Sequence, residues 1–264
     1  MKYRGLIITM IVMLSIIIVL LLGVLYLGIN NTGFIQLGFF SGNKADKIIY
    51  DKGYDVGLIN NIEVLSSAGD VKIEESNDSN VRVLVYGKED DGLRVDLENG
   101  NLKVDYREHH KHHIISFGGY LSEIIIYVPK TYDKNLDLKL DYGDLDITSI
   151  ENASIKVNES CGDIKAGKVK NIEIDNDYGN VKIEEVLNRL NIKTDCGNVK
   201  IGKVNLKEDS SIKCDMGDVK IEEKNDIYVD AKVDLGDCKI GNNNRHSEIT
   251  LKVDMSCGDI KIAN

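Results

Sequence analysis

The strongest constraint on the fold of this chain is a short sequence motif that recurs seven times between Leu136 and Ile262. Each copy centres on a glycine followed by Asp or Asn, and these glycines are Gly143, Gly162, Gly179, Gly197, Gly217, Gly236 and Gly258. Neighbouring glycines are 17 residues apart at the closest (162 to 179) and 22 at the widest (236 to 258). A repeat of about twenty residues is typical of a solenoid. The chain is therefore predicted to form a stack of similar coils.

The apolar pattern changes phase at each of these glycines. Counted from the glycine, positions −7, −5, −3 and −1 are mostly apolar, as in Leu251, Val253 and Cys257. After the glycine, the apolar residues stand at +2 and +4. A straight strand would expose one of these sets, whereas a corner buries both, and glycine followed by Asp or Asn tolerates positive φ. We predict structural corners at these seven glycines and at Gly69, with side chains at −1 pointing inward.

The predicted fold class is all-β, a β-solenoid that resembles a single-stranded β-helix, with about seven to nine short coils. Residues 131–264 hold its regular coils. Residues 48–130 are predicted to be an irregular β region that caps the N-terminal end of the stack. A hairpin signal at Asn99-Gly100 and a strand ending at Pro129 support this division.

The N-terminal segment is predicted to be a membrane anchor. Residues 6–29 carry no charge, and 24 residues of helix would span about 36 Å, enough to cross a bilayer. Residues 1–30 are then a cytoplasmic tip and signal anchor, and 31–47 a juxtamembrane spacer. Lys2 and Arg4 precede the anchor, which places the N-terminus in the cytoplasm and the β region outside the cell membrane. The alternative is a cleaved signal peptide.

The net charge and the columns of outward-facing charged residues indicate which kinds of partner the chain can bind. The formal net charge is −10, which disfavours nucleic acid as a partner. Position +3 is lysine in six of the seven copies, and position −2 is mostly Asp. We interpret these columns as a solvated, aggregation-resistant face. The alternative is a surface that binds divalent cations or an anionic polymer.

Five cysteines fall on the repeat. Cys161, Cys196 and Cys257 share position −1 in coils that are two or more apart, about 9.6 Å or farther, which is too far for a disulfide. We expect buried thiols that pack as small apolar groups. A pair between Cys238 and Cys257 stays open.

Four histidines, His109, His110, His112 and His113, flank Lys111 and form the one candidate metal site. On a strand they would alternate between two faces, so a polar hairpin tip is the favoured interpretation. A weak zinc, copper or nickel site and a pH-sensitive patch are the alternatives. No motif for nucleophilic, phosphate-binding or metal-dependent catalysis is present. We therefore expect a protein that is not an enzyme and has no cofactor.

Three segments in order resemble the bacterial "putative adhesin" family, a domain of unknown function built from β-strand repeats. They are the motif around Gly69, the strand from Ile124 to Pro129, and the repeated Gly-Asp/Asn-x-Lys-Ile motifs. The resemblance covers roughly residues 45–264. It implies a β-solenoid that is often membrane-tethered and linked to envelope stress, and it carries over no site residues.

The predicted function is an extracellular scaffold or adhesin-like binding module that contacts an unknown envelope protein or wall polymer. The alternative is a metal- or ligand-sensing ectodomain that uses residues 109–113 or the acidic columns. Because the sequence ends directly after its last copy of the motif, we also expect an uncovered last coil. Its edge would carry Leu251, Val253, Ile260 and Ile262. Self-association through that C-terminal coil follows from this expectation.

Overall fold

The computed structural model describes residues 47–87, 92–107 and 122–263. Within these ranges the chain contains strands, one short 3-10 turn and no α-helix. Every strand pairs with another strand between residues 48 and 262, inside one compact unit, Gly42–Asn264. The all-β repeat fold is therefore confirmed. The predicted anchor lies outside the described ranges, and no helix within them is long and apolar enough to cross a membrane.

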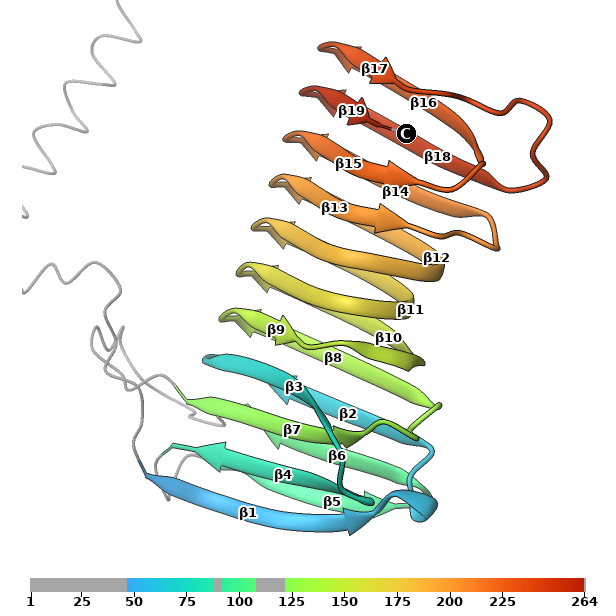
Figure 1. Ribbon diagram of the computed structural model, residues 1–264. Coiled ribbons are helices and arrows are strands. Elements are labelled where there is room, and N and C mark those ends of the chain that lie inside the picture. The colour runs from blue at the N-terminus through green and yellow to red at the C-terminus, as the bar shows by residue number, and fades with distance from the viewer. Residues whose placement is uncertain (1–46, 88–91, 108–121, 264) are drawn as a thin grey trace, which may run out of the picture. The chain divides into compact units, whose positions relative to one another are not determined.

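The elements fall into an N-terminal region and a regular stack (Figure 1). The N-terminal region contains β1 (Ile48–Asp55), η1 (Val56–Leu58), β2 (Asn61–Ser66), β3 (Asp70–Ser76), β4 (Asn80–Tyr86), β5 (Arg94–Glu98), β6 (Asn101–Tyr106) and β7 (Glu123–Pro129). The regular stack contains β8 (Asn135–Tyr142), β9 (Leu145–Ile147), β10 (Ile150–Cys161), β11 (Ile164–Tyr178), β12 (Val181–Cys196), β13 (Val199–Val204), β14 (Ser210–Met216), β15 (Val219–Lys224), β16 (Tyr228–Leu235), β17 (Cys238–Ile240), β18 (Thr250–Cys257) and β19 (Ile260–Ile262).

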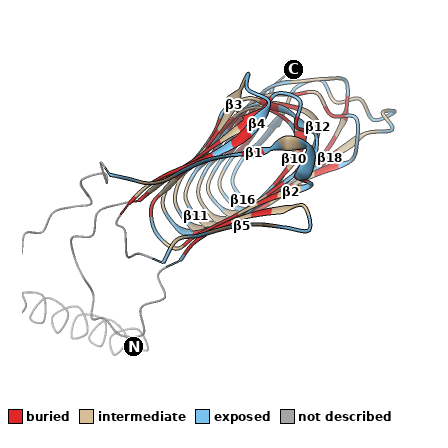
Figure 2. Ribbon diagram, turned by 90° about the horizontal axis from the view of Figure 1, so that it is seen from below, coloured by how far each residue is buried: buried red, intermediate tan, exposed pale blue. Residues whose placement is uncertain are grey.

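Each regular coil has one strand before its glycine and one after it, and neighbouring coils pair in parallel register. Ile174 of β11, for example, lies beside Val157 of β10 on one side and Ile192 of β12 on the other. Since the register brings equal repeat positions together, the apolar positions form buried columns inside the stack. Figure 2 colours each residue by its burial and shows buried residues recurring along the stacked strands.

The coils do not stack in sequence order. The first coil, β2–β3, lies between β6–β7 and β8–β9. The last coil, β18–β19, lies between β14–β15 and β16–β17 (Figure 1). At both ends of the solenoid, the coil nearest the end of the sequence is thus covered on both sides by a segment that is internal in the sequence.

This order corrects the expectation for the C-terminal end. Leu251, Val253, Ile260 and Ile262 are each 2 % exposed or less, because β16–β17 covers them. The open end of the stack is β16–β17 instead. Among the described strands, β16 pairs only with β18, and β17 only with β19. Ala231, Val233 and Ile240 are half-buried there, although the equivalent positions of inner coils are buried.

The opposite end is closed by antiparallel strands. Strand β4 runs antiparallel to both β7 and β1, and β5 forms a hairpin with β6 around Asn99 and Gly100. Both hairpin residues have positive φ, 51° and 79°. The two neighbouring tyrosines Tyr50 and Tyr54 join their hydroxyls in a hydrogen bond on β1. An antiparallel layer ends the parallel stack because its strands no longer continue the coil repeat.

The side chains at position −1 point outward, which corrects the prediction that they are buried. Tyr142 is 64 % exposed, Tyr178 60 % and Met216 59 %. The physical reason is the tightness of the corner. A Cβ added at Gly197 would lie 1.8 Å from the Gly179 carbonyl oxygen of the coil below. Neighbouring coils therefore approach closely at the corner, and along the chain the inward set ends at −3 and resumes at +2.

Candidate interaction surface

Two constraints act on the glycine at each corner. Seven of the eight predicted corner glycines have φ between 113° and 150°, a region that side-chain-bearing residues rarely adopt; the exception is Gly162. The second constraint is contact between coils. A Cβ at Gly162 would lie 1.9 Å from the Gly143 carbonyl oxygen, so glycine is required there by close approach alone. Sequence reasoning identified the first constraint and missed the second.

The Asp or Asn after each glycine builds a hydrogen-bonded column, the corner ladder. In each step the backbone N–H of one coil donates to the side-chain Oδ1 of the neighbouring coil. For example, Asn180 N donates to Asp163 Oδ1 at 2.8 Å, and Asp259 N donates to Asp218 Oδ1 at 2.9 Å. In spatial order the ladder contains Asp70, Asp144, Asp163, Asn180, Asn198, Asp218, Asp259 and Asp237. These side chains satisfy the backbone donors of the corner, a role that the residue type at a fixed position could have suggested.

Beside the corner ladder runs the apolar stripe formed by position −1. The register of the strands places its members next to one another in the order Tyr142, Cys161, Tyr178, Cys196, Met216, Cys257 and Leu235. Among the described residues, six large apolar side chains are classed as exposed, and four of them belong to this stripe. Neighbouring members are about 4.8 Å apart, so the stripe extends for about 29 Å.

The geometry of the corner determines which cysteine thiols are exposed. All five cysteines are free. Cys161 and Cys257 are exposed on the apolar stripe and Cys196 is half-buried there, so the expectation of buried thiols is wrong for these positions. Cys238 is exposed on β17 at the open end. Cys214, at position −3, is fully buried, and burial raises the pKa of its thiol to about 11.

Position +3 forms a lysine column on the outer side of the second strands. In spatial order it contains Lys165, Lys182, Lys200, Lys220, Lys261 and Lys239, and all six are exposed. Glu222 pairs with Lys200 at 3.2 Å and with Lys220 at 3.0 Å. The other four lysines have no ion pair within the described ranges. Stacked like charges of this kind raise the local positive potential.

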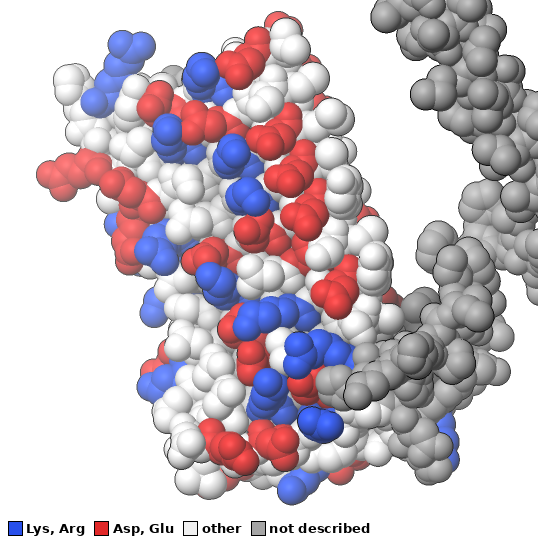
Figure 3. Space-filling model, turned by 180° about the vertical axis from the view of Figure 1, so that it is seen from behind, with Lys and Arg blue, Asp and Glu red and all other residues white. Residues whose placement is uncertain are grey.

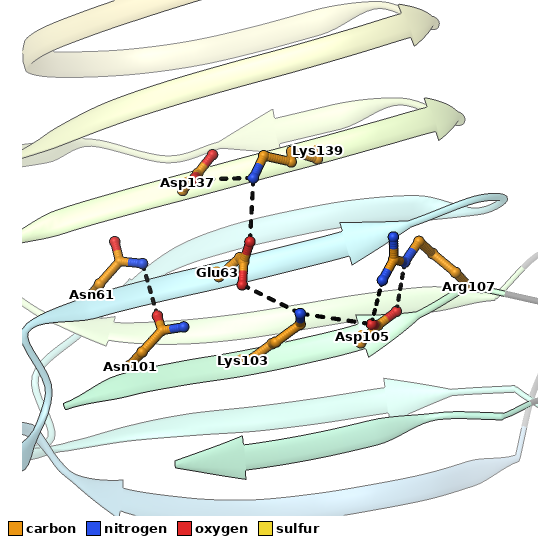
Figure 4. Close-up of polar contacts among 8 residues, drawn as sticks. All are labelled: Asn61, Glu63, Asn101, Lys103, Asp105, Arg107, Asp137 and Lys139. Atoms are coloured by element: carbon orange, nitrogen blue, oxygen red, sulfur yellow. Dashed lines mark hydrogen bonds and ion pairs between the residues drawn. The ribbon is translucent and has the colours of Figure 1, made fainter. Parts of the chain in front are cut away.

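Nearer the capped end, acidic and basic side chains alternate across strands (Figure 4). Glu63 lies between Lys103, at 3.7 Å, and Lys139, at 3.2 Å. Asp105 is 7 % exposed and accepts two hydrogen bonds from Arg107, at 2.8 and 2.6 Å. Those hydrogen bonds hold the pKa of the Asp105 carboxyl below its usual range. This network neutralises the charges that face outward from β2, β6 and β8, and it offers little free charge to a partner.

A short polar column lies inside the stack, at position −3 of three consecutive coils. It consists of Glu159, Asn176 and Thr194, which are 3 %, 0 % and 1 % exposed and lie side by side. Asn176 donates to the Gly179 carbonyl at 3.0 Å. Neither carboxyl oxygen of Glu159 has a hydrogen-bond partner among the described residues. Burial, with Asp144 and Asp163 nearby, raises the pKa of Glu159 to about 8, so this group is largely protonated at neutral pH.

The candidate metal site at His109, His110, His112 and His113 lies outside the described ranges, and metal sensing there stays a prediction. Within those ranges, no group of three or more His, Cys, Asp or Glu side chains is arranged to hold a metal ion. The fifth histidine, His246, is exposed in the loop between β17 and β18.

Stacked parallel coils with glycine corners and a continuous side-chain ladder define a β-solenoid repeat protein. The chain belongs to the Toastrack DUF4097 family, which matches residues 59–263. This match confirms the resemblance seen in the sequence. No curated protein matches the chain.

Similar solved structures include three bacterial proteins with low sequence identity. A "putative adhesin" from Bacteroides fragilis is 13 % identical, with 84 % of this chain and 99 % of that chain covered and a TM-score of 0.43. A "putative cell adhesion protein" from Clostridium sporogenes is 12 % identical, with 82 % and 99 % covered and a TM-score of 0.39. A "putative lipid binding protein" from Parabacteroides distasonis is 13 % identical, with 81 % and 93 % covered and a TM-score of 0.35.

Proposed function

We propose that this chain is a non-enzymatic, adhesin-like binding module of the cell envelope, anchored through residues 1–30 with its solenoid outside the membrane. An uncharged segment of 24 residues preceded by Lys2 and Arg4 supports the anchor and its orientation. Through that anchor, binding outside the cell would be coupled to the membrane, which fits a role in envelope stress. The ligand is an anionic wall polymer.

The lysine column is the observation that carries this proposal. Six ammonium groups stand on adjacent coils at a spacing of about 4.8 Å and cover about 24 Å. Four of them lack an ion pair within the described ranges, so their charge is available to a ligand. A row of evenly spaced cations suits an extended polymer with a repeating anionic group better than a compact small molecule. Attraction of this kind weakens as salt is added.

A cosedimentation experiment tests the proposal. The full chain in nanodiscs of neutral lipid is mixed with purified cell walls, before and after extraction of their anionic polymers. We expect binding to intact walls only, and loss of binding in the triple variant Lys165→Ala, Lys182→Ala, Lys261→Ala. The matched control removes three lysines from the other sheet face, at Lys156, Lys193 and Lys252. Equal loss in the two triple variants, or undiminished binding to extracted walls, would contradict the proposal.

The orientation has its own test. Protease added to intact cells from which the wall has been removed should digest residues 44–264. Protection of that part until the membrane is lysed would reverse the topology.

A further inference from the structure

The apolar stripe has the properties of an interaction surface. Tyr142, Tyr178, Met216 and Leu235 are each between 59 % and 70 % exposed and stand in one line, separated only by cysteines. Isolated exposed apolar residues are common on protein surfaces, but an ordered row of them usually marks a contact site. The stripe is one side chain wide, so it fits a partner that contacts it along a narrow line.

The charges beside the stripe select the partner. On one side, position −2 contributes Asp141, Asp177, Asp195, Asp215 and Asp234. On the other side, the corner ladder contributes Asp144, Asp163, Asp218, Asp259 and Asp237, none of which has an ion pair within the described ranges. Figure 3 shows acidic side chains gathered in a column along the stack, next to uncharged surface. An apolar line between two acidic rows attracts a partner that is apolar in the middle and basic on both flanks.

These flanks argue against a second copy and against an anionic lipid surface. Two copies that joined their stripes about a two-fold axis would bring acidic rows against acidic rows. Lys193, Lys213 and Lys232 each lie within 3.9 Å of an Asp at position −2, which neutralises part of one row and leaves the other row unchanged. A negative lipid surface meets the same repulsion.

The spacing of the stripe fits an α-helix. Its members recur every 4.8 Å or so, and a helix presents one residue of a given face about every turn, or 5.4 Å. Along the 29 Å of the stripe, a helix would use about 19 residues. An extended strand fits less well, because side chains on one of its faces are about 6.8 Å apart.

We propose that the apolar stripe is the docking site for a basic amphipathic helix of another protein, which lies along the solenoid axis over the corners. Its apolar face contacts the tyrosine, cysteine, methionine and leucine side chains, and its Lys and Arg residues face the two acidic rows. This site is separate from the lysine column and does not depend on the wall-polymer proposal.

The stripe contains its own reporters. The full chain, in nanodiscs of neutral lipid, is labelled with a maleimide with and without a 20-residue helical peptide that has one line of leucines flanked by lysines. Cys161, Cys196 and Cys257 should react more slowly with the peptide present, by about tenfold at a concentration nine times Kd. Cys238, which is exposed off the stripe, should react at an unchanged rate. Mass spectrometry of the labelled fragments gives each rate.

Two comparisons and a series of protein concentrations decide the outcome. A peptide with glutamates in place of the lysines should not protect the thiols, and Tyr178→Lys, at an exposed position, should abolish protection without lowering the melting temperature. The proposal is overturned if the acidic peptide protects equally, if Tyr178→Lys has no effect, or if the lysine peptide gives no protection. It is also overturned if the thiols are already protected without peptide, in a way that depends on protein concentration, because a second copy would then occupy the stripe.

Discussion

The parallel stack of coils ends in a different way at each end of this solenoid. At the N-terminal end, β4, β5 and β1 leave the coil repeat and run antiparallel, so the parallel stack meets a different layer. At the other end, β16–β17 is an ordinary coil with the same glycine and the same ladder residue, and none of the described strands pairs with its far side. The repeat itself therefore contains no stop signal. A stop requires residues that break the repeat, and among the described residues β1, β4 and β5 supply them.

The largest expected difference concerns the corner glycine. Gly197→Val in an inner coil meets both a φ of 150° and a carbonyl oxygen 1.8 Å away, so we expect a loss of about 4 kcal/mol or more in urea unfolding. Gly236→Val meets the same local clash at the open end. There the coil can loosen without its neighbours, so the global loss should be much smaller, with faster hydrogen exchange in β16–β17. Similar global losses for the two variants would mean that the last coil is held as firmly as the inner ones.

A matched pair at position +4 gives the next effect. Ile73 of β3, near the capped end, is 0 % exposed, whereas Ile240 of β17 is half-buried at the open end. Ile73→Ala should cost about 2–4 kcal/mol because it leaves a cavity between covered coils. Ile240→Ala should cost less than about 1 kcal/mol, because its side chain is covered on one side only. Urea melts of the two variants check this, and equal costs would show that the β16–β17 end is covered.

Glu159 gives the inner coils a pH dependence between pH 6 and pH 8. Its folded pKa of about 8 exceeds the usual 4.5, so the folded state holds the proton more tightly than the unfolded state does. Stability from this group is therefore fully present below pH 4.5 and is lost as the pH rises toward 8. Unfolding free energy should fall by about 1 kcal/mol per pH unit between pH 6 and pH 8. Glu159→Gln should flatten that slope, and an unchanged slope would assign it to other groups.

The smallest effect is expected on the outside. Lys200→Ala should change the unfolding free energy by no more than about 0.5 kcal/mol, because this side chain is exposed and its pair with Glu222 is solvated. A loss as large as that of Gly197→Val would remove the distinction between corner and outer column.

Much of this architecture could be predicted from the sequence because the repeat encodes it directly. The spacing of the glycines predicts the length of each coil. The phase change of the apolar pattern predicts a corner at residues such as Gly179. The orientation of Tyr178 could not be predicted, because the corner is tightened by a carbonyl of another coil, and such contacts do not appear in one copy of a repeat. For the same reason, one copy of the repeat indicates turn chemistry at the Asp or Asn after the glycine, and does not indicate the hydrogen bonds between coils. The coil order was missed because β16 and β18 carry nearly equivalent apolar patterns, so either can stack on β14.

Strands β18–β19 are inserted between β14–β15 and β16–β17, which leaves β16–β17 as the open end. Cys214 provides the direct test, because it lies opposite Met255 in the register, while Val233 lies one coil farther away. Adjacent coils are about 4.8 Å apart, within disulfide range, and alternate coils about 9.6 Å, beyond it. Under mild oxidation, Met255→Cys should form a disulfide with Cys214, and Val233→Cys should not. The reverse pattern, with a disulfide only in Val233→Cys, would contradict this coil order and show that the coils stack in sequence order.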